Sequence, residues 1–276
     1  MGKLFTSLIA GAALGILSAP GAIAAEPLRV CSSTEEPPYS TAESDGFENR
    51  LAAVLAKAMG RDLEEVFIDK PAIYLVRDGI DKDLCDVVMG VDAADERVLT
   101  SRPYYRTGYA FVSKADKAFQ GTRWEDVDHP DMNRFSYRFH SPAETILKYA
   151  GKYEANLPYT YSLIDFKSRR NQYINVDAER LVGEVAAGEA DMAIAFAPTV
   201  ARYVKSSATP MRLALIENDI ERSDGVVIEL QYDQSVGVAK DNPELLKEVD
   251  DALDKARAEI QAILEDEGIP LLPVGS

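Results

Sequence analysis

Few side chains in this sequence have the types and spacings that enzymes and metal sites use. The only histidines, His129 and His140, have no second histidine, cysteine or acid at a metal-ligand spacing, so no zinc or copper site is predicted. The sequence also has no nucleophile elbow, phosphate-binding glycine-rich loop, EF-hand loop or C-x-x-C pair. We therefore expect no catalytic residues and no metal or cofactor in this chain.

Cys31 and Cys85 are the only cysteines. In an oxidising compartment they would favour a disulfide, which would close a long loop and stabilise the fold by roughly 4 kcal/mol. Cys31 is expected to end one strand and Cys85 to begin another. If these strands are parallel neighbours, an offset of about four residues would hold the sulfurs too far apart for a bridge. The sequence leaves open a disulfide and a pair of buried, reduced cysteines.

The N-terminal residues have the organisation of a secretory signal peptide. Lys3 precedes an apolar run over 4–17, and Ala22-Ile23-Ala24 supplies the small residues that the processing peptidase reads. The apolar run is too short for a membrane span. We expect residues 1–24 to be removed on export to the periplasm, and no insertion of the mature chain into the membrane.

The mature chain is predicted to be strongly acidic. The sequence has 30 basic and 46 acidic residues, and residues 1–24 contain one lysine and no acid, so 29 minus 46 leaves a net charge of −17. Such a surface repels nucleic acid and anionic lipid, and it favours a basic partner. Acidity that serves only solubility is the alternative explanation.

Strands and helices alternate in the first part of the mature chain. Strands are predicted over 28–31, 63–68 and 86–91, and helices over 47–58 and 72–79. The first helix has its apolar residues on one face and ends at Gly60. A β-α-β-α-β order predicts a parallel sheet with helices on both faces.

A long aromatic strand over 104–112 leads into a second, smaller α/β unit. Further strands are predicted over 134–139, 191–195, 211–216 and 235–239, and further helices over 142–149, 177–187, 198–205 and 245–264. Residues 151–176 contain several tyrosines and arginines but little periodicity. This segment is either functional or an ordinary surface excursion.

Three motifs resemble the type II periplasmic solute-binding proteins. They are Asp95-Glu96-Arg97, Ser101-Arg102-Pro103-Tyr104-Tyr105 and the stretch from Gly237 to Leu245. The resemblance implies a two-domain α/β fold in which each domain is a mostly parallel sheet flanked by helices. It assigns residues 25–113 and 234–276 to a larger domain and 114–233 to a smaller one, with two hinge strands near 110–114 and 234–239.

The same resemblance implies a ligand site between the domains. In amino-acid binders of this superfamily, an arginine at the position of Arg97 clamps the ligand carboxylate. An ion pair of Arg97 within its own domain is the alternative. The expected threonine is missing from residues 91–94, and the strand over 191–195 runs into Phe196 and Ala197 where an acid would hold an α-ammonium group. Ordinary amino-acid binding is therefore not expected.

Longer stretches are similar to the MxaJ (MoxJ) family, and this likeness covers nearly the entire mature chain. The stretches are residues 46–49, 70–79, 84–88 and 196–204. Members of this family are solute-binding-like proteins that are encoded with the periplasmic, pyrroloquinoline-quinone-dependent methanol dehydrogenase, an enzyme of α and β subunits. The resemblance implies an accessory role in assembly or maturation of the dehydrogenase, through contact with that enzyme.

Tyrosine and arginine are favoured at protein interfaces, which makes residues 151–176 the predicted contact region. The candidate interface residues are Tyr159, Tyr161, Arg169, Arg170 and Tyr173. For each of them, packing within its own domain or simple solvation is the alternative.

The competing hypothesis is a true receptor for a small organic anion or a cofactor. Its cleft would be lined by Tyr39, Asp92, Arg97 and Ser141. Ser141 begins a predicted helix whose free N–H groups favour an anion, although a plain N-cap before Pro142 explains the same residues. A third hypothesis, a quinone- or metal-dependent enzyme, requires a bound chromophore or metal.

Overall fold

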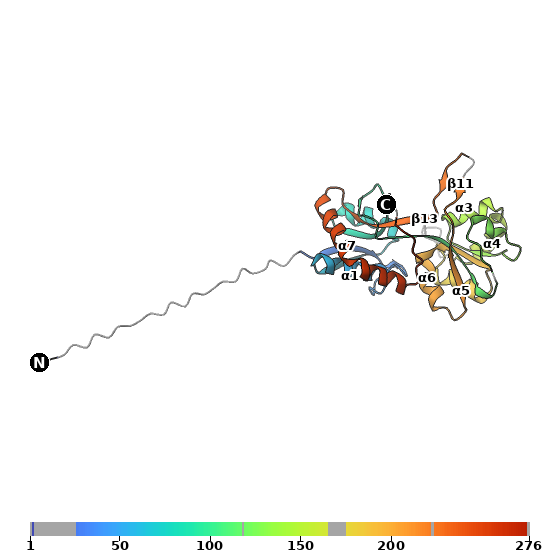
Figure 1. Ribbon diagram of the computed structural model, residues 1–276, viewed down its shortest axis with the longest axis horizontal. Coiled ribbons are helices and arrows are strands. Elements are labelled where there is room, and N and C mark those ends of the chain that lie inside the picture. The colour runs from blue at the N-terminus through green and yellow to red at the C-terminus, as the bar shows by residue number, and fades with distance from the viewer. Residues whose placement is uncertain (1, 3–25, 118, 165–174, 222–223, 275–276) are drawn as a thin grey trace.

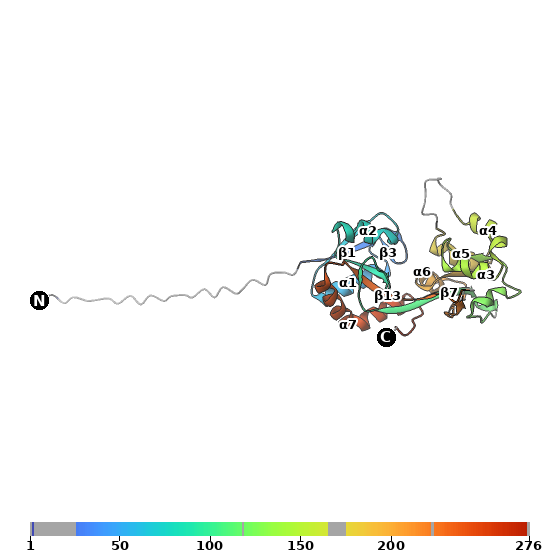
Figure 2. The ribbon, with the colours of Figure 1, turned by 90° about the horizontal axis from the view of Figure 1, so that it is seen from above.

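The computed structural model describes residues 2, 26–117, 119–164, 175–221 and 224–274. The predicted signal peptide, residues 1–24, lies outside the described residues apart from Gly2. Two lobes are joined by two long strands, β7 (Tyr105–Lys114) and β13 (Gln231–Val238), as Figures 1 and 2 show. Within the described part of the chain, no helix has the length and apolar character needed to cross a membrane.

The first lobe contains a sheet in the order β4-β1-β5-β13. Its elements are β1 (Leu28–Ser33), β2 (Glu35–Glu36), β3 (Ser40–Thr41), α1 (Phe47–Met59), β4 (Leu63–Ile68), η1 (Ala72–Tyr74), α2 (Leu75–Asp78), η2 (Ile80–Lys82), β5 (Val87–Asp92), β6 (Leu99–Thr100) and α7 (Pro243–Asp266). β1 pairs in parallel with both β4 and β5, as the alternation of elements predicted. The apolar faces of α1 and α7 meet in one core, where Leu51, Leu55, Val249 and Ile260 are buried.

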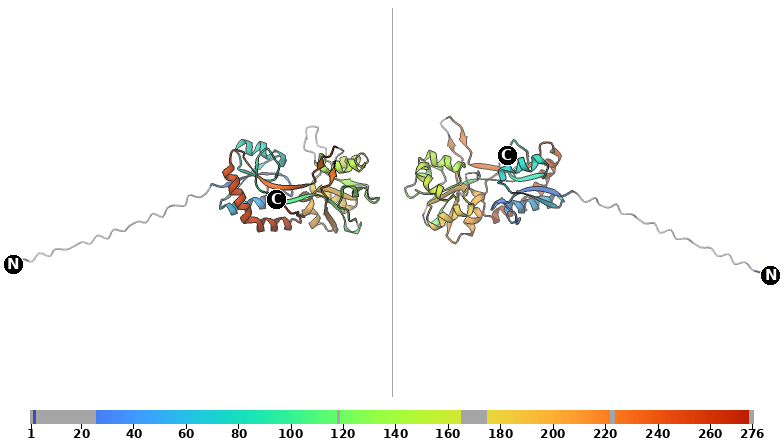
Figure 3. Two further views of the ribbon diagram at one scale, coloured as in Figure 1. Left: turned by 45° about the horizontal axis from the view of Figure 1, so that its top comes forward. Right: turned by 180° about the vertical axis from the view of Figure 1, so that it is seen from behind.

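The second lobe contains a sheet in which β7 pairs with β9 and β10, and β9 also pairs with β8. Its other elements are η3 (Ala115–Lys117), η4 (Trp124–Asp128), β8 (Phe135–Ser136), α3 (Pro142–Tyr149), α4 (Tyr153–Ser162), α5 (Ala178–Ala187), β9 (Met192–Phe196), α6 (Ala197–Ser206), β10 (Met211–Leu215), β11 (Ile220–Glu221) and β12 (Val227–Ile228). The β11–β12 pair projects from this lobe (Figures 1 and 3).

The two-domain α/β fold class is confirmed, but strand direction in the second lobe differs from the prediction. Among the described pairs of this lobe, only β8–β9 is parallel, while β7 runs antiparallel to β9 and β10. A buried apolar run predicts that both faces of a strand are covered, and it does not encode the direction of a neighbour. In this lobe the central strand is β7, which enters from the first lobe, and its neighbours β9 and β10 run opposite to it.

Both crossing strands change partners where they pass between the lobes. β7 pairs with β13 as far as Gly108 and with β9 from Tyr109 onward, and β13 passes from β7 to β5 at Gln234. The crossing in β7 precedes the predicted hinge stretch 110–114, which pairs within the second lobe. A Cβ atom at Gly108 would lie 2.7 Å from the Leu230 carbonyl oxygen, so this position has no room for a side chain. The division into residues 25–113 with 234–276, and 114–233, remains our proposal.

Helix α4 lies in the segment that showed little periodicity in the sequence. Pro158 is inside the helix, where it removes a backbone hydrogen bond. Polar contacts fix the helix to the lobe: Asn156 Oδ1 accepts from the Phe135 N–H, and Asn156 Nδ2 donates to the Phe135 carbonyl, both at 2.8 Å. A helix held in this way has no continuous apolar stripe to reveal it.

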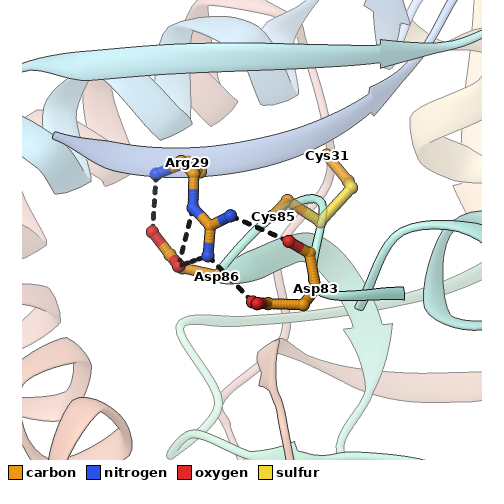
Figure 4. The surroundings of a disulfide bond; sticks show 5 residues. All are labelled: Arg29, Cys31, Asp83, Cys85 and Asp86. Carbon is orange, nitrogen blue, oxygen red and sulfur yellow. Dashed lines mark hydrogen bonds and ion pairs between the residues drawn. A yellow bond between two sulfur atoms is a disulfide. The ribbon is translucent and has the colours of Figure 1, made fainter. Parts of the chain in front are cut away.

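Cys31 and Cys85 form a disulfide with their Cα atoms 5.5 Å apart (Figure 4). Cys85 lies in the loop before β5, so the register offset that argued against a bridge does not apply. The same loop is held to β1 by Arg29, which contacts Asp83 at 3.1 Å and Asp86 at 2.6 Å.

Candidate functional site: the cleft between the lobes

Two adjoining cavities lie between the lobes and share Gly90, Asp92, Arg138 and Thr199 in their walls. The first has a volume of about 370 Å³, and we call it the aromatic chamber because Tyr109, Phe196 and Tyr232 line it. The second has a volume of about 320 Å³, and we call it the acidic chamber. Its acids are Glu36, Glu48, Asp92 and Asp95. Concave sites of this size between domains are where small ligands commonly bind.

The aromatic chamber is built where β7, β9 and β13 meet. Tyr109 is paired with Phe196 across β7 and β9, and their ring centroids are 5.7 Å apart. The ring of Tyr232, from β13, lies 5.9 Å from Phe196 and 6.5 Å from Tyr109. Burial raises the pKa of Tyr232 to about 12, so its hydroxyl stays protonated and donates to the Glu229 carbonyl at 2.6 Å. The three rings give this chamber a rigid, mostly apolar wall.

Glu48 lies in the first turn of α1 and faces the acidic chamber. Gly90 on β5 makes room for its carboxylate, because a Cβ atom at Gly90 would clash with Glu48 Oε1. Desolvation, and then the charge of Glu36, raise the pKa of Glu48 to about 8. Among the described residues, the Glu48 carboxylate has no hydrogen-bond donor or ion-pair partner. It is the least satisfied acid of the cleft.

Desolvation also raises the pKa of Glu36, although the positive charge of Arg138 opposes the shift. Arg138 comes from the other lobe, and its Nη1 lies 3.9 Å from Glu36 Oε2. Its Nε donates to the Val176 carbonyl at 3.1 Å. Arg138 is therefore already engaged from two directions.

The four predicted cleft residues all line these cavities. Arg97 and Tyr39 face the acidic chamber, Ser141 faces the aromatic chamber, and Asp92 reaches both. Arg97 is held within its own lobe, since it contacts Asp95 at 2.6 Å and donates to the Ile73 carbonyl at 3.1 Å. This geometry favours the alternative, an ion pair within the domain, over a free carboxylate clamp. A ligand-binding role for these residues remains a proposal.

Ser141 precedes Pro142 at the start of α3, as the sequence predicted, but its side chain does not cap the helix. The hydroxyl donates to the Arg138 carbonyl at 2.6 Å. Asp92 Oδ1 accepts from the Ala94 N–H at 2.9 Å. Both side chains therefore shape the loops that carry them.

The chain itself holds the two lobes together around the cleft. The Tyr39 hydroxyl lies 2.9 Å from Thr199 Oγ1 at the start of α6. Further along α6, Arg202 contacts the buried carboxylate of Glu267 at 2.8 Å, just beyond the end of α7. These two contacts join the first lobe to the second beside the cleft.

Sequence reasoning missed several residues of the site, including Glu48, Arg138, Thr199 and Tyr232. Glu48 could have been found from its position in the sequence. It precedes Leu51, Ala52 and Leu55 by three, four and seven residues, so it shares the buried face of α1. An acid on the apolar face of a helix is an informative exception, because charged residues are rarely buried without a partner. The other residues come from distant parts of the chain, and only the fold brings them together.

The predicted interface residues are only partly described. The Tyr159 hydroxyl donates to Glu184 Oε2 at 2.8 Å, and Arg134 covers its ring at 5.2 Å. Tyr161 is 63% exposed and touches Phe139, with ring centroids 5.1 Å apart. Arg169, Arg170 and Tyr173 lie outside the described residues.

Replacing Glu48 with glutamine is expected to raise the free energy of unfolding by about 2 kcal/mol at pH 7 and to change it little at pH 4.5. The pKa of about 8 in the folded protein lies above the value in the unfolded chain. The free energy of unfolding of the wild type therefore falls as pH rises from the unfolded-state pKa to the folded-state pKa. Glutamine keeps the shape of the side chain and never ionises. Urea unfolding of both proteins at the two pH values measures the difference.

A suitable control is Glu259→Gln, since Glu259 forms an exposed ion pair with Lys57 and lines neither chamber. Its effect is expected to stay within about 0.5 kcal/mol at both pH values. An equal change at pH 4.5 and pH 7 for Glu48→Gln would contradict the assigned pKa.

Comparisons with known proteins agree with this architecture. Residues 28–266 match the family of bacterial extracellular solute-binding proteins, family 3. The chain is 59% identical to protein MoxJ of Paracoccus denitrificans over 264 residues, which cover 96% of each chain. It is 47% identical to protein MoxJ of Methylorubrum extorquens over 249 residues, or 90% of this chain and 83% of the relative.

A solved structure gives the same picture. The crystal structure of MxaJ from Methlophaga aminisulfidivorans MPT superposes with a TM-score of 0.83 at 48% identity, and the match covers 89% of this chain and 100% of that one. The resemblance noted in the sequence is thereby confirmed. The chain belongs to the bacterial extracellular solute-binding proteins of family 3 and, within them, to the MoxJ (MxaJ) proteins.

Proposed function

We propose that this protein is a periplasmic accessory protein of methanol oxidation. In this role it binds the pyrroloquinoline-quinone-dependent methanol dehydrogenase and assists its assembly or maturation. The observation that carries the proposal is the 59% identity to a MoxJ protein along almost the full length of both chains. The expected export to the periplasm fits a partner that works there.

The geometry of the cleft supports a role other than amino-acid transport. Arg97, which would hold a ligand carboxylate, is paired with Asp95. Strand β9 ends at Phe196, and α6 follows at once, so no acid stands there to receive an α-ammonium group. A zwitterion would leave its carboxylate unpaired in the cleft, at a cost of several kcal/mol. The two-lobed fold is thus retained, while the free arginine and the acid that would hold an amino acid are missing from their expected positions.

A receptor for a small organic anion or a cofactor remains the second candidate, and the two chambers between the lobes are the observation in its favour. Four acids line the acidic chamber, which opposes an anion there. We therefore rank the accessory role first. The acidic surface of the protein also suits a basic partner.

The purified protein is expected to bind immobilised methanol dehydrogenase saturably, and more weakly at high salt than at low salt, because salt screens an electrostatic interface. Titration at two ionic strengths measures this. The absence of binding at any salt, to either the mature or the cofactor-free enzyme, would sink the proposal.

Within this proposal, Tyr161→Ala is expected to weaken binding at least tenfold, because exposed tyrosines are frequent interface anchors. Tyr149→Ala is the matched control, since Tyr149 is also exposed but its ring packs against Trp124 instead. Charge reversal at Arg169 and Arg170 tests the two arginine candidates. If Tyr161→Ala and Tyr149→Ala bind equally well, Tyr161 is not part of the interface.

A further inference from the structure

We propose that the cleft binds an organic cation that carries no carboxylate. Its ammonium or guanidinium group would occupy the acidic chamber, and its apolar body would pack on Tyr109, Phe196 and Tyr232. This inference concerns the isolated protein and does not depend on the accessory role in methanol oxidation.

The charge of the acidic chamber is the first argument. Four carboxylates and two arginines, Arg97 and Arg138, line this cavity. Both arginines are already engaged: Arg97 with Asp95 and the Ile73 carbonyl, and Arg138 with the Val176 carbonyl and, more distantly, Glu36. Among the described residues of its lining, an anion would meet no free cation, whereas a cation would meet acids in excess.

Glu48 supplies the second argument. Among the described residues, its carboxylate has no donor, although it lies at the wall of the cavity with most of its surface enclosed by protein. An unsatisfied carboxylate in such a place is costly, and an ammonium or guanidinium group would satisfy it with a charge-assisted hydrogen bond. The described groups that interact electrostatically with Glu48 are Glu36, Tyr39, Tyr104 and Tyr105, and none of them is a cation.

The third argument is that an aromatic chamber adjoins an acidic one. Aromatic faces attract cations and stack on flat apolar groups, and Asp92 lies at the junction of the two chambers. Each chamber suits part of a small molecule. A metal ion is a poorer fit, since the described residues contain no group of three His, Cys, Asp or Glu side chains placed to hold one.

Three probes on one scaffold test the charge preference: phenethylamine as the cation, phenylalanine as the zwitterion and 3-phenylpropionate as the anion. Isothermal titration of the purified protein at pH 8 is expected to show that phenethylamine binds at least tenfold more tightly than the other two. Equal or tighter binding of 3-phenylpropionate or phenylalanine would overturn the proposal.

Variants then locate the site. Glu48→Gln is expected to weaken phenethylamine binding at least tenfold while the protein remains at least as stable as the wild type, and Glu259→Gln is expected to bind as the wild type does. Asp92→Asn, at the junction of the chambers, gives an independent second test if Glu48→Gln fails to fold. Unchanged binding in both Glu48→Gln and Asp92→Asn would place any bound cation outside the cleft and refute the inference.

The cationic group could come from a free amine or from a basic side chain of another protein. Blocked tripeptides distinguish these sources: Gly-Arg-Gly presents a basic side chain, and Gly-Gln-Gly is its uncharged control. Tighter binding of the arginine peptide than of phenethylamine would assign the site to a protein side chain, and the reverse order would assign it to a free amine. If neither phenethylamine nor the arginine peptide binds, the cleft is not a cation site.

Discussion

Replacing both Cys31 and Cys85 with alanine is expected to lower the free energy of unfolding by about 4 kcal/mol. The bond joins residues 54 positions apart, and in the chain-entropy model a loop of this length strongly restricts the unfolded chain. Both cysteines are also buried in a small apolar cluster with Leu75 and Ile80, so the loss of packing adds to the effect.

Urea unfolding with and without a reductant measures this loss. Reduction of the wild type is expected to lower its stability by somewhat less, because the reduced cysteines keep their packing. The double variant serves as the control and does not respond to reductant. A wild-type protein whose unfolding is the same in both conditions would show that the disulfide contributes nothing to stability.

Replacing Glu267 with alanine is expected to cost about 3 kcal/mol and to loosen the contact between the lobes. Glu267 is 5% exposed and accepts hydrogen bonds from Arg202 of α6 at 2.8 and 2.9 Å, and it also pairs with Arg50 of α1. Its removal leaves two partly buried arginines without this partner. Breaking a buried pair from one side is far more costly than losing a surface pair.

Thermal and urea unfolding give the stability change, and small-angle X-ray scattering gives any increase in the radius of gyration. Glu265→Ala is the matched control, because Glu265 is exposed and, among the described residues, its carboxylate accepts only from Gln261 of the same helix. Glu267→Gln keeps an acceptor for the arginines and is expected to fall between the two. A loss below about 0.5 kcal/mol for Glu267→Ala would show that the lobes do not depend on this ion pair.

Much of the fold could be predicted from local patterns. The apolar face of α1 and its glycine terminus were visible in the sequence, and α3 was predicted with its correct bounds. α4 was missed because Pro158 interrupts it and buried Asn156 attaches it to β8. Patterns of apolar residues do not report a helix that polar contacts hold in place.

The candidate site was less predictable. Arg97 was identified through family resemblance, Ser141 through its place at a helix start, and Tyr39 and Asp92 as further residues of the implied cleft; all four line the cleft. Their hydrogen-bond partners could not be predicted, because partners such as Thr199 are far away in the chain and are brought near only by the packing of the lobes.

The sequence by itself determined the order and type of most elements, the acidic charge and the family, because these follow from local periodicity, composition and motif spacing. The tertiary structure alone decided that Cys31 and Cys85 form a disulfide, that β7 runs antiparallel to β9, and that Glu48 faces a cavity where no described residue donates to its carboxylate. Each of these depends on the distance and direction between residues far apart in the chain. Such quantities are fixed when the core packs, and no single segment encodes them.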